Sequence, residues 1–502
     1  MRNVLEYLEH TAAVCGSRTA VEDVKKSCTF RELRDRAKSI GSRLAEVTGP
    51  REPVAVYMDK GVDALTAFMG SVYAGCFYVF VNTELPAARI RDILEISGAR
   101  VALTTGEWKE KLSEPGFTGR VFCLEEIEEE RNEALLSAIR SQAVDIDPLY
   151  ANFTSGSTGK PKGVVVSHRS VLDFIGVFPE MFGIGEQDVI GNQAPFDFDV
   201  SVKDIYTSLK TGARLVVIPK AYFSFPTQLL DYLCERKVTT LIWAVSALCM
   251  VTALKGFSYR VPELVDKVLF SGEKMPMKHL KAWRRHLPDA SFVNLYGPTE
   301  ITCNCTYYRI GPDFAGKELP IGRAFPNEKV FLLDEEDRLV TEPDRPGEIC
   351  VAGTALALGY YGNPEETAKH FVQNPLNGVY RELIYRTGDL GRYDGDGLLY
   401  FVGRKDFQIK HMGHRIELEE IEAALYRVPG VEQNCCIFLE NKNQIAACYV
   451  GTAAEKDIRQ ILADILPMYM IPGLYRCLEA MPLKNGKIDR SAIKALWEGR
   501  QE

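Results

Sequence analysis

Apolar and polar residues follow two different periods in the first 150 residues. Short β-branched and apolar runs, PVAVYM at 53–58 and VALTT at 101–105, predict buried strands. The segments between them have helical spacing, and one helix is predicted to start after Thr29, in the sequence TFREL. Because strands and helices alternate, we expect an α/β fold in which helices cover a parallel sheet.

A long run without charged residues covers 64–82. At Cys76 it changes from helical spacing to the β-rich sequence CFYVFV, and it contains Gly70 and Gly75. We interpret it as a buried helix that leads into a strand, rather than as a membrane span of about 20 apolar residues. The chain has 502 residues, which is too long for one ordinary core, so we expect at least two domains.

Composition and charge narrow the class of protein. Hydrophobic residues make up 46% and charged residues 25%, as in soluble globular proteins. The net charge of −8 gives no support for a nucleic-acid partner, because phosphates call for a basic face. The 13 cysteines include no CxxC pair and predict reduced thiols. Glu6 and Glu9 interrupt the N-terminus where a signal peptide is apolar, so we expect a cytoplasmic protein without membrane insertion.

The segment 152–166, NFTSGSTGKPKGVVV, is rich in glycine, hydroxyl residues and lysine just before a short β-branched run. Glycines let the backbone approach a ligand, and successive N–H groups and hydroxyls can then surround phosphate oxygens. Lys160 and Lys162 add positive charge. We interpret 154–163 as a loop for the β- and γ-phosphates of a nucleotide, with a solvated turn as the alternative. Pro161 excludes the usual pattern GxxxxGK[ST], which needs a hydroxyl residue after the lysine.

Further motifs follow this loop in order. They are FDVSV at 198–202, NLYGPTE at 294–300, YRTGDL at 385–390, YFVGRKD at 400–406 and NGKIDR at 485–490. With TSGSTGKPKG, they resemble the motifs of the adenylate-forming superfamily, which comprises acyl-CoA synthetases, luciferases, amino-acid adenylation domains of nonribosomal peptide synthetases, and D-alanine to carrier protein ligases. The resemblance covers essentially the whole chain.

The resemblance implies two domains. A large N-terminal domain, 1–403, would hold parallel-rich sheets with covering helices plus a distorted β-barrel. A small mobile C-terminal α+β domain, 404–502, would follow a hinge near Asp406. The resemblance also implies that the protein uses ATP and Mg²⁺.

Several nucleotide contacts implied by the resemblance make chemical sense. Tyr296 can stack on adenine, Asp389 can accept hydrogen bonds from the ribose hydroxyls, and Glu300 can ligate Mg²⁺ beside phosphate oxygens. Lys487 is the implied mobile catalytic lysine, which acts with Thr154 and Glu300 by neutralising charge at the α-phosphate. The full set of implied nucleotide ligands is Thr154, Ser155, Gly156, Ser157, Thr158, Gly159, Lys162, Asn294, Tyr296, Gly297, Thr299, Asp389, Phe401, Arg404 and Lys487.

The FDVSV motif aligns Asp199 with an aspartate that, in amino-acid adenylating relatives, pairs with the substrate's α-ammonium group. Each of two such charges needs the other in order to be buried. Asp197 is the nearest rival, and Asp199 could also be a helix N-cap. The other implied substrate contacts are Val200, Lys203, Ser271, Leu295, Cys303 and Lys487, and the projected pocket is completed by Ile242, Leu269 and Asn304.

Two of these positions bear on the identity of the substrate. A buried Lys203 would favour a substrate that carries a carboxylate or an amide, but Lys203 could equally point away from the pocket on a helix face. Around Asp199 the sequence is most similar to D-alanine to carrier protein ligases, which usually have a cysteine where this chain has Ser271. We therefore expect a small or polar amino acid, with acidic ones to be tested first.

The implied reaction is attack of the substrate carboxylate on the α-phosphate of ATP, with release of pyrophosphate. The small domain would then rotate, Lys487 would withdraw and a thiol would attack the adenylate. Only twelve residues follow Arg490, so a phosphopantetheinyl carrier protein would be a separate chain or a part trimmed away. The alternatives are an acyl- or aryl-CoA ligase and a nucleotide-binding regulatory protein with a degenerate site.

Overall fold

The computed structural model describes residues 1–156, 159–484 and 487–498. Its first sheet has seven strands, of which the central ones are parallel. In spatial order the strands are β19 (Gly359–Tyr360), β8 (Lys162–Ser167), β7 (Pro148–Thr154), β4 (Phe77–Val81), β3 (Pro53–Tyr57), β5 (Val101–Thr104) and β6 (Arg120–Cys123).

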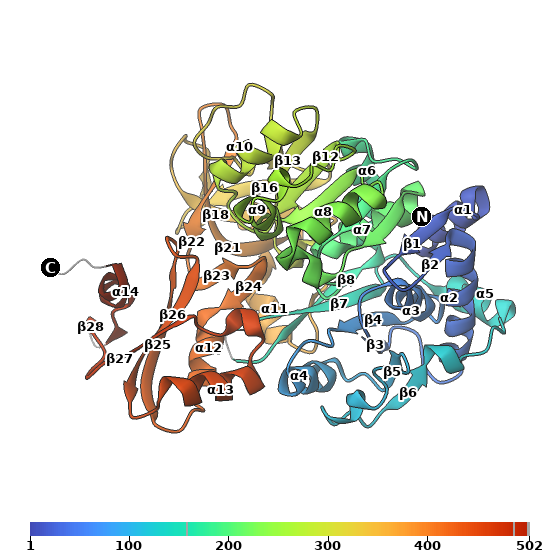
Figure 1. Ribbon diagram of the computed structural model, residues 1–502, viewed down its shortest axis with the longest axis horizontal. Helices are drawn as coiled ribbons and strands as arrows, with labels where there is room; N and C mark the ends of the chain where they lie inside the picture. The colour runs from blue at the N-terminus through green and yellow to red at the C-terminus, as the bar shows by residue number, and fades with distance from the viewer. Residues whose placement is uncertain (157–158, 485–486, 499–502) are drawn as a thin grey trace.

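A second, nine-stranded sheet lies beside the first in Figure 1, and its strands from β13 to β1 are parallel. The order is β15 (Arg323–Ala324), β14 (Thr306–Arg309), β13 (Ser291–Tyr296), β12 (Lys267–Ser271), β11 (Thr240–Ala244), β9 (Val189–Asn192), β10 (Arg214–Val217), β1 (Thr19–Glu22) and β2 (Ser27–Thr29).

Helices cover both sheets. One large hydrophobic cluster joins residues of the two sheets with buried faces of α1, α2, α3, α6 and α7, and a second cluster lies under α8, α9 and α10. The helices are α1 (Leu5–Cys15), α2 (Phe30–Ala45), α3 (Val62–Tyr73), α4 (Ala87–Ser97), α5 (Glu133–Gln142), α6 (His168–Phe182), α7 (Val200–Thr211), α8 (Pro226–Glu235), α9 (Val245–Ala253) and α10 (Met277–His286).

A third sheet is antiparallel and follows in sequence. Its strands are β16 (Glu328–Leu333), β17 (Leu339–Val340), β18 (Gly347–Gly353), β20 (Phe371–Gln373), β21 (Leu383–Tyr393) and β22 (Leu399–Arg404), with α11 (Pro364–His370) between β19 and β20. This half-barrel sheet corresponds to the barrel-like part that the sequence predicts.

The C-terminal residues form smaller elements with their own packing. Two hydrophobic clusters there draw their buried residues only from position 416 onward. The elements are β23 (Gln408–His411), β24 (His414–Glu417), α12 (Leu418–Leu425), β25 (Val431–Leu439), β26 (Gln444–Gly451), α13 (Glu455–Ile465), β27 (Leu474–Cys477), β28 (Leu483–Lys484), β29 (Lys487–Ile488) and α14 (Arg490–Glu498).

The mixed α/β class and the local predictions are confirmed. α2 starts after Thr29, whose hydroxyl accepts a hydrogen bond from the backbone N–H of Glu32, while the Glu32 carboxylate accepts one from the backbone N–H of Thr29. The uncharged run at 64–82 forms the buried helix α3 and the strand β4. Among the described residues, no helix combines the length and apolar character that a membrane crossing requires.

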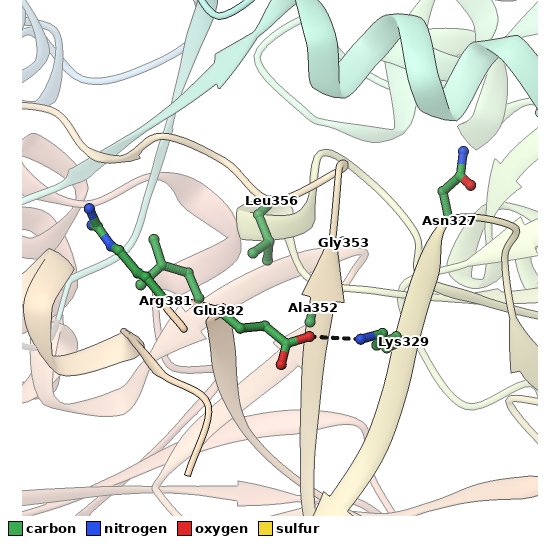
Figure 2. Close-up of a pocket in the computed structure, with 8 residues that line it drawn as sticks. Asn327, Lys329, Ala352, Gly353, Leu356, Arg381 and Glu382 are labelled. Carbon is green, nitrogen blue, oxygen red and sulfur yellow. Dashed lines mark hydrogen bonds and ion pairs between the residues drawn. The ribbon is translucent and has the colours of Figure 1, made fainter. Parts of the chain in front are cut away.

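A small hollow of about 420 Å³ lies on the antiparallel sheet and is shown in Figure 2. Lys329 and Glu382 face each other across it with a contact of 2.7 Å between Nζ and Oε1, and Asn327 and Arg381 lie at its two sides. None of the residues of the sequence motifs lines this hollow.

Glu328, at the start of β16, is expected to make stability depend on pH. Burial raises the pKa of this carboxyl from 4.5 to about 8. Between these two values the unfolded chain loses the proton while the folded chain keeps it, so the free energy of unfolding falls as pH rises. Glu328→Gln should therefore raise Tm relative to the parent at pH 8, with a difference that shrinks toward pH 5 in thermal unfolding by fluorimetry.

Glu348→Gln is the matched control, because this buried carboxylate pairs with Arg386 and Lys405, and the Arg386 hydrogen bond and charge help to hold its pKa below the usual value despite burial. That variant should lower Tm at pH 8. A Glu328→Gln effect that is equal at every pH would contradict the assignment.

Candidate active site

The sequence motifs converge on one edge of the nine-stranded sheet. Asp199 follows β9, Ser271 ends β12 and Tyr296 ends β13. These strands are parallel, so their carboxyl ends meet at the same edge, where ligands of open α/β sheets bind. A cleft of about 2370 Å³ reaches their neighbours Phe198 and Glu273, and its lining continues through the segment 401–414 to C-terminal residues as far as Lys494.

The Asp199 carboxylate is buried, with 8% of the residue exposed, and lies at the start of α7. Thr299 Oγ1 donates to Asp199 Oδ2 at 2.5 Å, and the Cys303 thiol lies 3.3 Å from the Asp199 carbonyl oxygen. Although Asp199 stands at the N-cap position, its side chain makes no capping hydrogen bond. The carboxylate therefore faces the site, and burial raises its pKa.

The rival Asp197 lies outside this group. Asp197 is a partly exposed residue, and its carboxylate accepts hydrogen bonds from Asn82 Nδ2 at 3.3 and 3.4 Å. Burial raises the pKa of Asp197 to about 6, although the Asn82 contact acts in the opposite direction. Asp197 is thus held by the residue that directly follows β4 of the first sheet.

Lys203 is fully buried and points into the predicted pocket. Its Nζ donates to Asn304 Oδ1 at 2.6 Å and lies 3.5 Å from Ser271 Oγ. Both partners are neutral, and among the described residues no carboxylate lies within ion-pair distance of the Lys203 ammonium group. The structure therefore opposes the alternative in which Lys203 faces away on the helix surface. The other projected pocket residues are all buried, namely Val200, Ile242, Leu269, Leu295 and Cys303.

The residues predicted to hold adenosine form a connected group. Tyr296 Oη donates to Asp389 Oδ2 at 2.5 Å, and Arg404 pairs with the other oxygen of Asp389. Arg404 also makes two contacts of 2.6 Å with Asp406. The Phe401 ring lies 6.4 Å from the Tyr296 ring, centroid to centroid. The predicted ribose carboxylate is thereby linked to the predicted hinge.

Two predicted nucleotide contacts also have roles within the fold. The Asn294 side-chain amide donates to the Pro320 carbonyl oxygen at 2.8 Å. A Cβ on Gly297 would lie 2.5 Å from Asn304 Cα, so the backbone of the chain itself excludes a side chain there. The requirement for glycine at this position therefore follows from packing as well as from the expected approach of a ligand.

The proposed metal ligand, Glu300, is completely buried. Tyr360 Oη donates to it at 2.7 Å, and Arg415 Nη1 lies 2.7 Å from both carboxylate oxygens. Burial alone would raise the pKa of Glu300, but Arg415 and Tyr360 hold it at about 2. Sequence reasoning missed both partners: Arg415 lies in HMGHRIELEEIE at 411–422 and Tyr360 in GYYGNPEET at 359–367, and neither segment supplied a predicted site residue.

Part of the phosphate loop is described. Thr154 Oγ1 is buried and has no hydrogen-bond partner among the described residues, so it fits a ligand oxygen. Ser155 Oγ donates to the Arg415 carbonyl oxygen at 2.8 Å, and Lys162 pairs with Glu366 at 3.2 Å. Gly159 has φ of +77°, in the left-handed region that favours glycine. The predicted ligands Ser157 and Thr158 lie outside the described residues.

Lys487 is not brought to this group. It lies on β29, its residue is exposed, and Figure 1 shows β28, the partner of β29, beside α14 at the left edge of the molecule. The β23–β24 hairpin reaches the site instead. Lys410 Nζ lies 5.2 Å from the Tyr296 ring centroid, and burial lowers the pKa of Lys410. Sequence reasoning gave Lys410 no role.

The family model for AMP-binding enzymes matches residues 8–361, and the chain belongs to that family. Delta-poly-L-ornithine synthetase of Acinetobacter baumannii is 32% identical over 498 residues, which is 97% of this chain and 36% of that protein. Tyrocidine synthase 2 of Brevibacillus parabrevis is 31% identical over 500 residues, which is 98% of this chain and 13% of that protein. The chain thus spans only part of the length of these relatives.

Solved structures agree with this placement. The holo form of PA1221, a nonribosomal peptide synthetase protein with adenylation and carrier (PCP) domains, matches with a TM-score of 0.83 and 25% identity over 98% of this chain and 84% of that chain. The adenylation domain AlmE of Vibrio cholerae, solved with glycyl-adenosine-5'-phosphate, matches with a TM-score of 0.86 and 22% identity over 100% and 98% of the two chains, a likeness of fold.

Proposed function

We propose that the protein activates an amino acid with ATP as an aminoacyl-adenylate, releases pyrophosphate, and transfers the aminoacyl group to the phosphopantetheine thiol of a carrier protein. The observation that carries the proposal is the buried carboxylate of Asp199, since a substrate ammonium group would compensate its charge. A relative named for the synthesis of poly-L-ornithine, a polymer of an amino acid, and the PA1221 structure with its PCP domain support an amino acid and a carrier.

The chain's residues can supply positioning and charge neutralisation. Asp199 would hold the ammonium group and thereby orient the substrate carboxylate, which is itself the nucleophile. Asp389 and Tyr296 would fix the adenosine, and Thr154 offers a hydroxyl to a phosphate oxygen. Bound Mg²⁺ would neutralise phosphate charge, and Glu300 is the carboxylate suited to hold it.

The proposed mechanism needs two arrangements of the chain. We place the division between 1–403 and 404–502, with the hinge near Asp406. The separate hydrophobic clusters from position 416 onward support a C-terminal unit that packs independently. The exposed position of Lys487 supports a second arrangement, in which that lysine reaches the α-phosphate.

ATP–pyrophosphate exchange with Mg²⁺ tests the proposal. The substrates should include all proteinogenic amino acids, D-alanine, and several aryl and fatty acids. We expect a signal confined to one or a few amino acids. Activity on aryl or fatty acids alone would favour the acyl- or aryl-CoA ligase instead, because such substrates have no ammonium group for Asp199. If none of these acids supported exchange, both the amino-acid adenylation and the CoA ligase function would be contradicted.

For the substrate itself we propose an amino acid whose side chain carries a carboxylate or an amide. Lys203 supports this, because its buried ammonium group donates to the neutral Asn304, lies near the neutral Ser271 and forms no ion pair among the described residues. A substrate carboxylate would complete the compensation of that charge.

Lys203→Met is expected to lower kcat/KM for an acidic substrate by about 10²-fold, the effect of removing one partner of a buried ion pair. ATP–pyrophosphate exchange at varied substrate concentrations measures this kcat/KM. For apolar amino acids of similar size, kcat/KM should fall little or rise. Lys210→Met, near the end of the same helix, is the control, since Lys210 bonds to Gly176 and Ile175 carbonyl oxygens outside the pocket. A spectrum that peaks on bulky apolar amino acids in both proteins would exclude an acidic substrate.

A further inference from the structure

The segment 193–199 joins β9 to α7 and carries Asp199 into the site. Among the described residues, the Asp199 carboxylate accepts one hydrogen bond, which comes from Thr299. A carboxylate with so few contacts takes its position mainly from its own backbone. The contacts that hold segment 193–199 therefore bear on where a substrate ammonium group can bind.

Lys60 holds the start of this segment. It follows β3 of the first sheet and lines the cleft. Its Nζ donates to Asn192 Oδ1 at 3.0 Å. It also donates to the carbonyl oxygens of Gln193 at 2.9 Å and Ala194 at 3.4 Å. An ammonium group has three N–H donors, and these three acceptors use all of them. Because two acceptors are backbone atoms, the contact fixes the path of the chain.

The same contact extends through Asn192 to α7. Asn192 Nδ2 donates to Asp204 Oδ2 at 2.7 Å, and both residues are fully buried. Asp204 lies on α7, whose N-cap position is Asp199. The bridge from Lys60 through Asn192 to Asp204 thus ties both ends of segment 193–199 to the first sheet. The opposite charges at its two ends reduce the cost of burying them.

We propose that Lys60 is a positioning residue for the amino acid, because through segment 193–199 it sets the place at which the Asp199 carboxylate meets the substrate ammonium group. This proposal rests on the proposed function of Asp199. Lys60 has no N–H donor left for substrate or nucleotide, so it acts only through the chain. The first sheet thereby takes part in substrate recognition, whereas Ser271 and Leu295 lie on strands of the second sheet.

ATP–pyrophosphate exchange with Lys60→Met tests this role. We expect kcat/KM for the amino acid to fall by at least about tenfold, because misplacement of a binding group by about 1 Å is costly. Most of the loss should be a higher KM, since the ammonium contact binds the substrate before the chemical step. AMP affinity, measured by calorimetry, should change by less than about twofold, because segment 193–199 contains no predicted nucleotide contact.

A double-mutant cycle with Asp199→Asn separates positioning from a merely structural role. If Lys60 acts through Asp199, adding Lys60→Met to Asp199→Asn should change the residual kcat/KM by less than about twofold. Two effects that simply multiply would mean that Lys60 acts independently of Asp199, and the proposal would be overturned.

Lys220→Met is the matched control. Lys220 follows β10 of the second sheet, pairs with Glu84 and lines the same cleft, but that contact does not involve segment 193–199. Its kcat/KM should stay within about twofold of the parent value. If Lys60→Met fails to fold in a thermal unfolding assay, Lys60→Gln takes its place. Its amide keeps two N–H donors, so we expect a smaller rise in KM.

An unchanged kcat/KM in the Lys60 variant, or an equal loss of AMP affinity, would overturn the positioning role while leaving the proposed function intact. Absence of exchange with every amino acid in the parent protein would overturn both.

Discussion

Replacing Asp199 by asparagine is expected to abolish amino-acid-dependent ATP–pyrophosphate exchange. Asp199 is buried, and it contacts Thr299 through its carboxylate and Cys303 through its carbonyl oxygen. In the asparagine variant a bound substrate ammonium group would therefore have no counter-charge. Removing one partner of a buried ion pair costs about 3–5 kcal/mol, which corresponds to a loss of about 10²- to 10⁴-fold in kcat/KM. Exchange rates over a range of substrate concentrations measure it.

Asp197→Asn is the matched control for this experiment. Asp197 lies two residues earlier and bonds to Asn82, away from Thr299. We expect an effect of about threefold or less, as for a substitution outside the site. If Asp199→Asn retained full activity on an amino acid, another group would have to bind the substrate ammonium. The buried carboxylate of Asp199 would then no longer support the proposed function.

The same experiment separates the two reaction classes. An aryl or fatty acid has no ammonium group, and a buried unpaired aspartate would oppose its binding. For such a substrate, Asp199→Asn should leave exchange unchanged or improve it. The sign of the change therefore identifies the class even before the natural substrate is known.

Local features of the chain could be predicted from its sequence because their causes lie within a few residues. The start of α2 depends on Thr29 and Glu32, three residues apart, and α3 and β4 follow from one uncharged run. The sequence placed Asp199 and Thr299 in two separate motifs, and the structure adds that the parallel strands before them bring the two side chains into contact.

Contacts that depend on how the C-terminal elements pack against the rest of the chain could not be predicted from the sequence. Arg415 and Glu300 are 115 residues apart, and only the arrangement of β23 and β24 brings them together. The same arrangement explains why Lys410, rather than Lys487, lies over Tyr296. A sequence motif indicates which residues can reach a site, but it does not specify how the C-terminal elements pack and therefore which residue lies there.

The direction of the Lys203 side chain could not be predicted from the sequence either. Helical periodicity alone cannot tell whether position 203 faces the pocket, because all of α7 from Val200 to Leu209 is buried. The contacts with Ser271 and Asn304 come from β12 and from the segment after β13. Packing of the helix against the sheet edge, rather than local sequence, decides the direction of this side chain.

Lys487→Ala is expected to remove the first step of the reaction selectively. In the arrangement described here Lys487 is exposed on β29, so it can act on the α-phosphate only after the C-terminal elements have moved. Its ammonium group would there neutralise charge that grows in the transition state, a contribution of about 10²- to 10³-fold. Pyrophosphate exchange should fall by that factor.

AMP affinity measured by calorimetry should stay within about twofold in Lys487→Ala, since the observed arrangement places Tyr296, Asp389 and Arg404 together without Lys487. Lys484→Ala, at the position paired with Lys487 across β28 and β29, is the matched control and should retain exchange. If both lysine variants kept full exchange, the C-terminal hairpin would have no part in adenylation. If AMP binding failed together with exchange in Lys487→Ala alone, the lysine would contribute to ground-state binding of the nucleotide, and the arrangement seen here would not be the one that holds AMP.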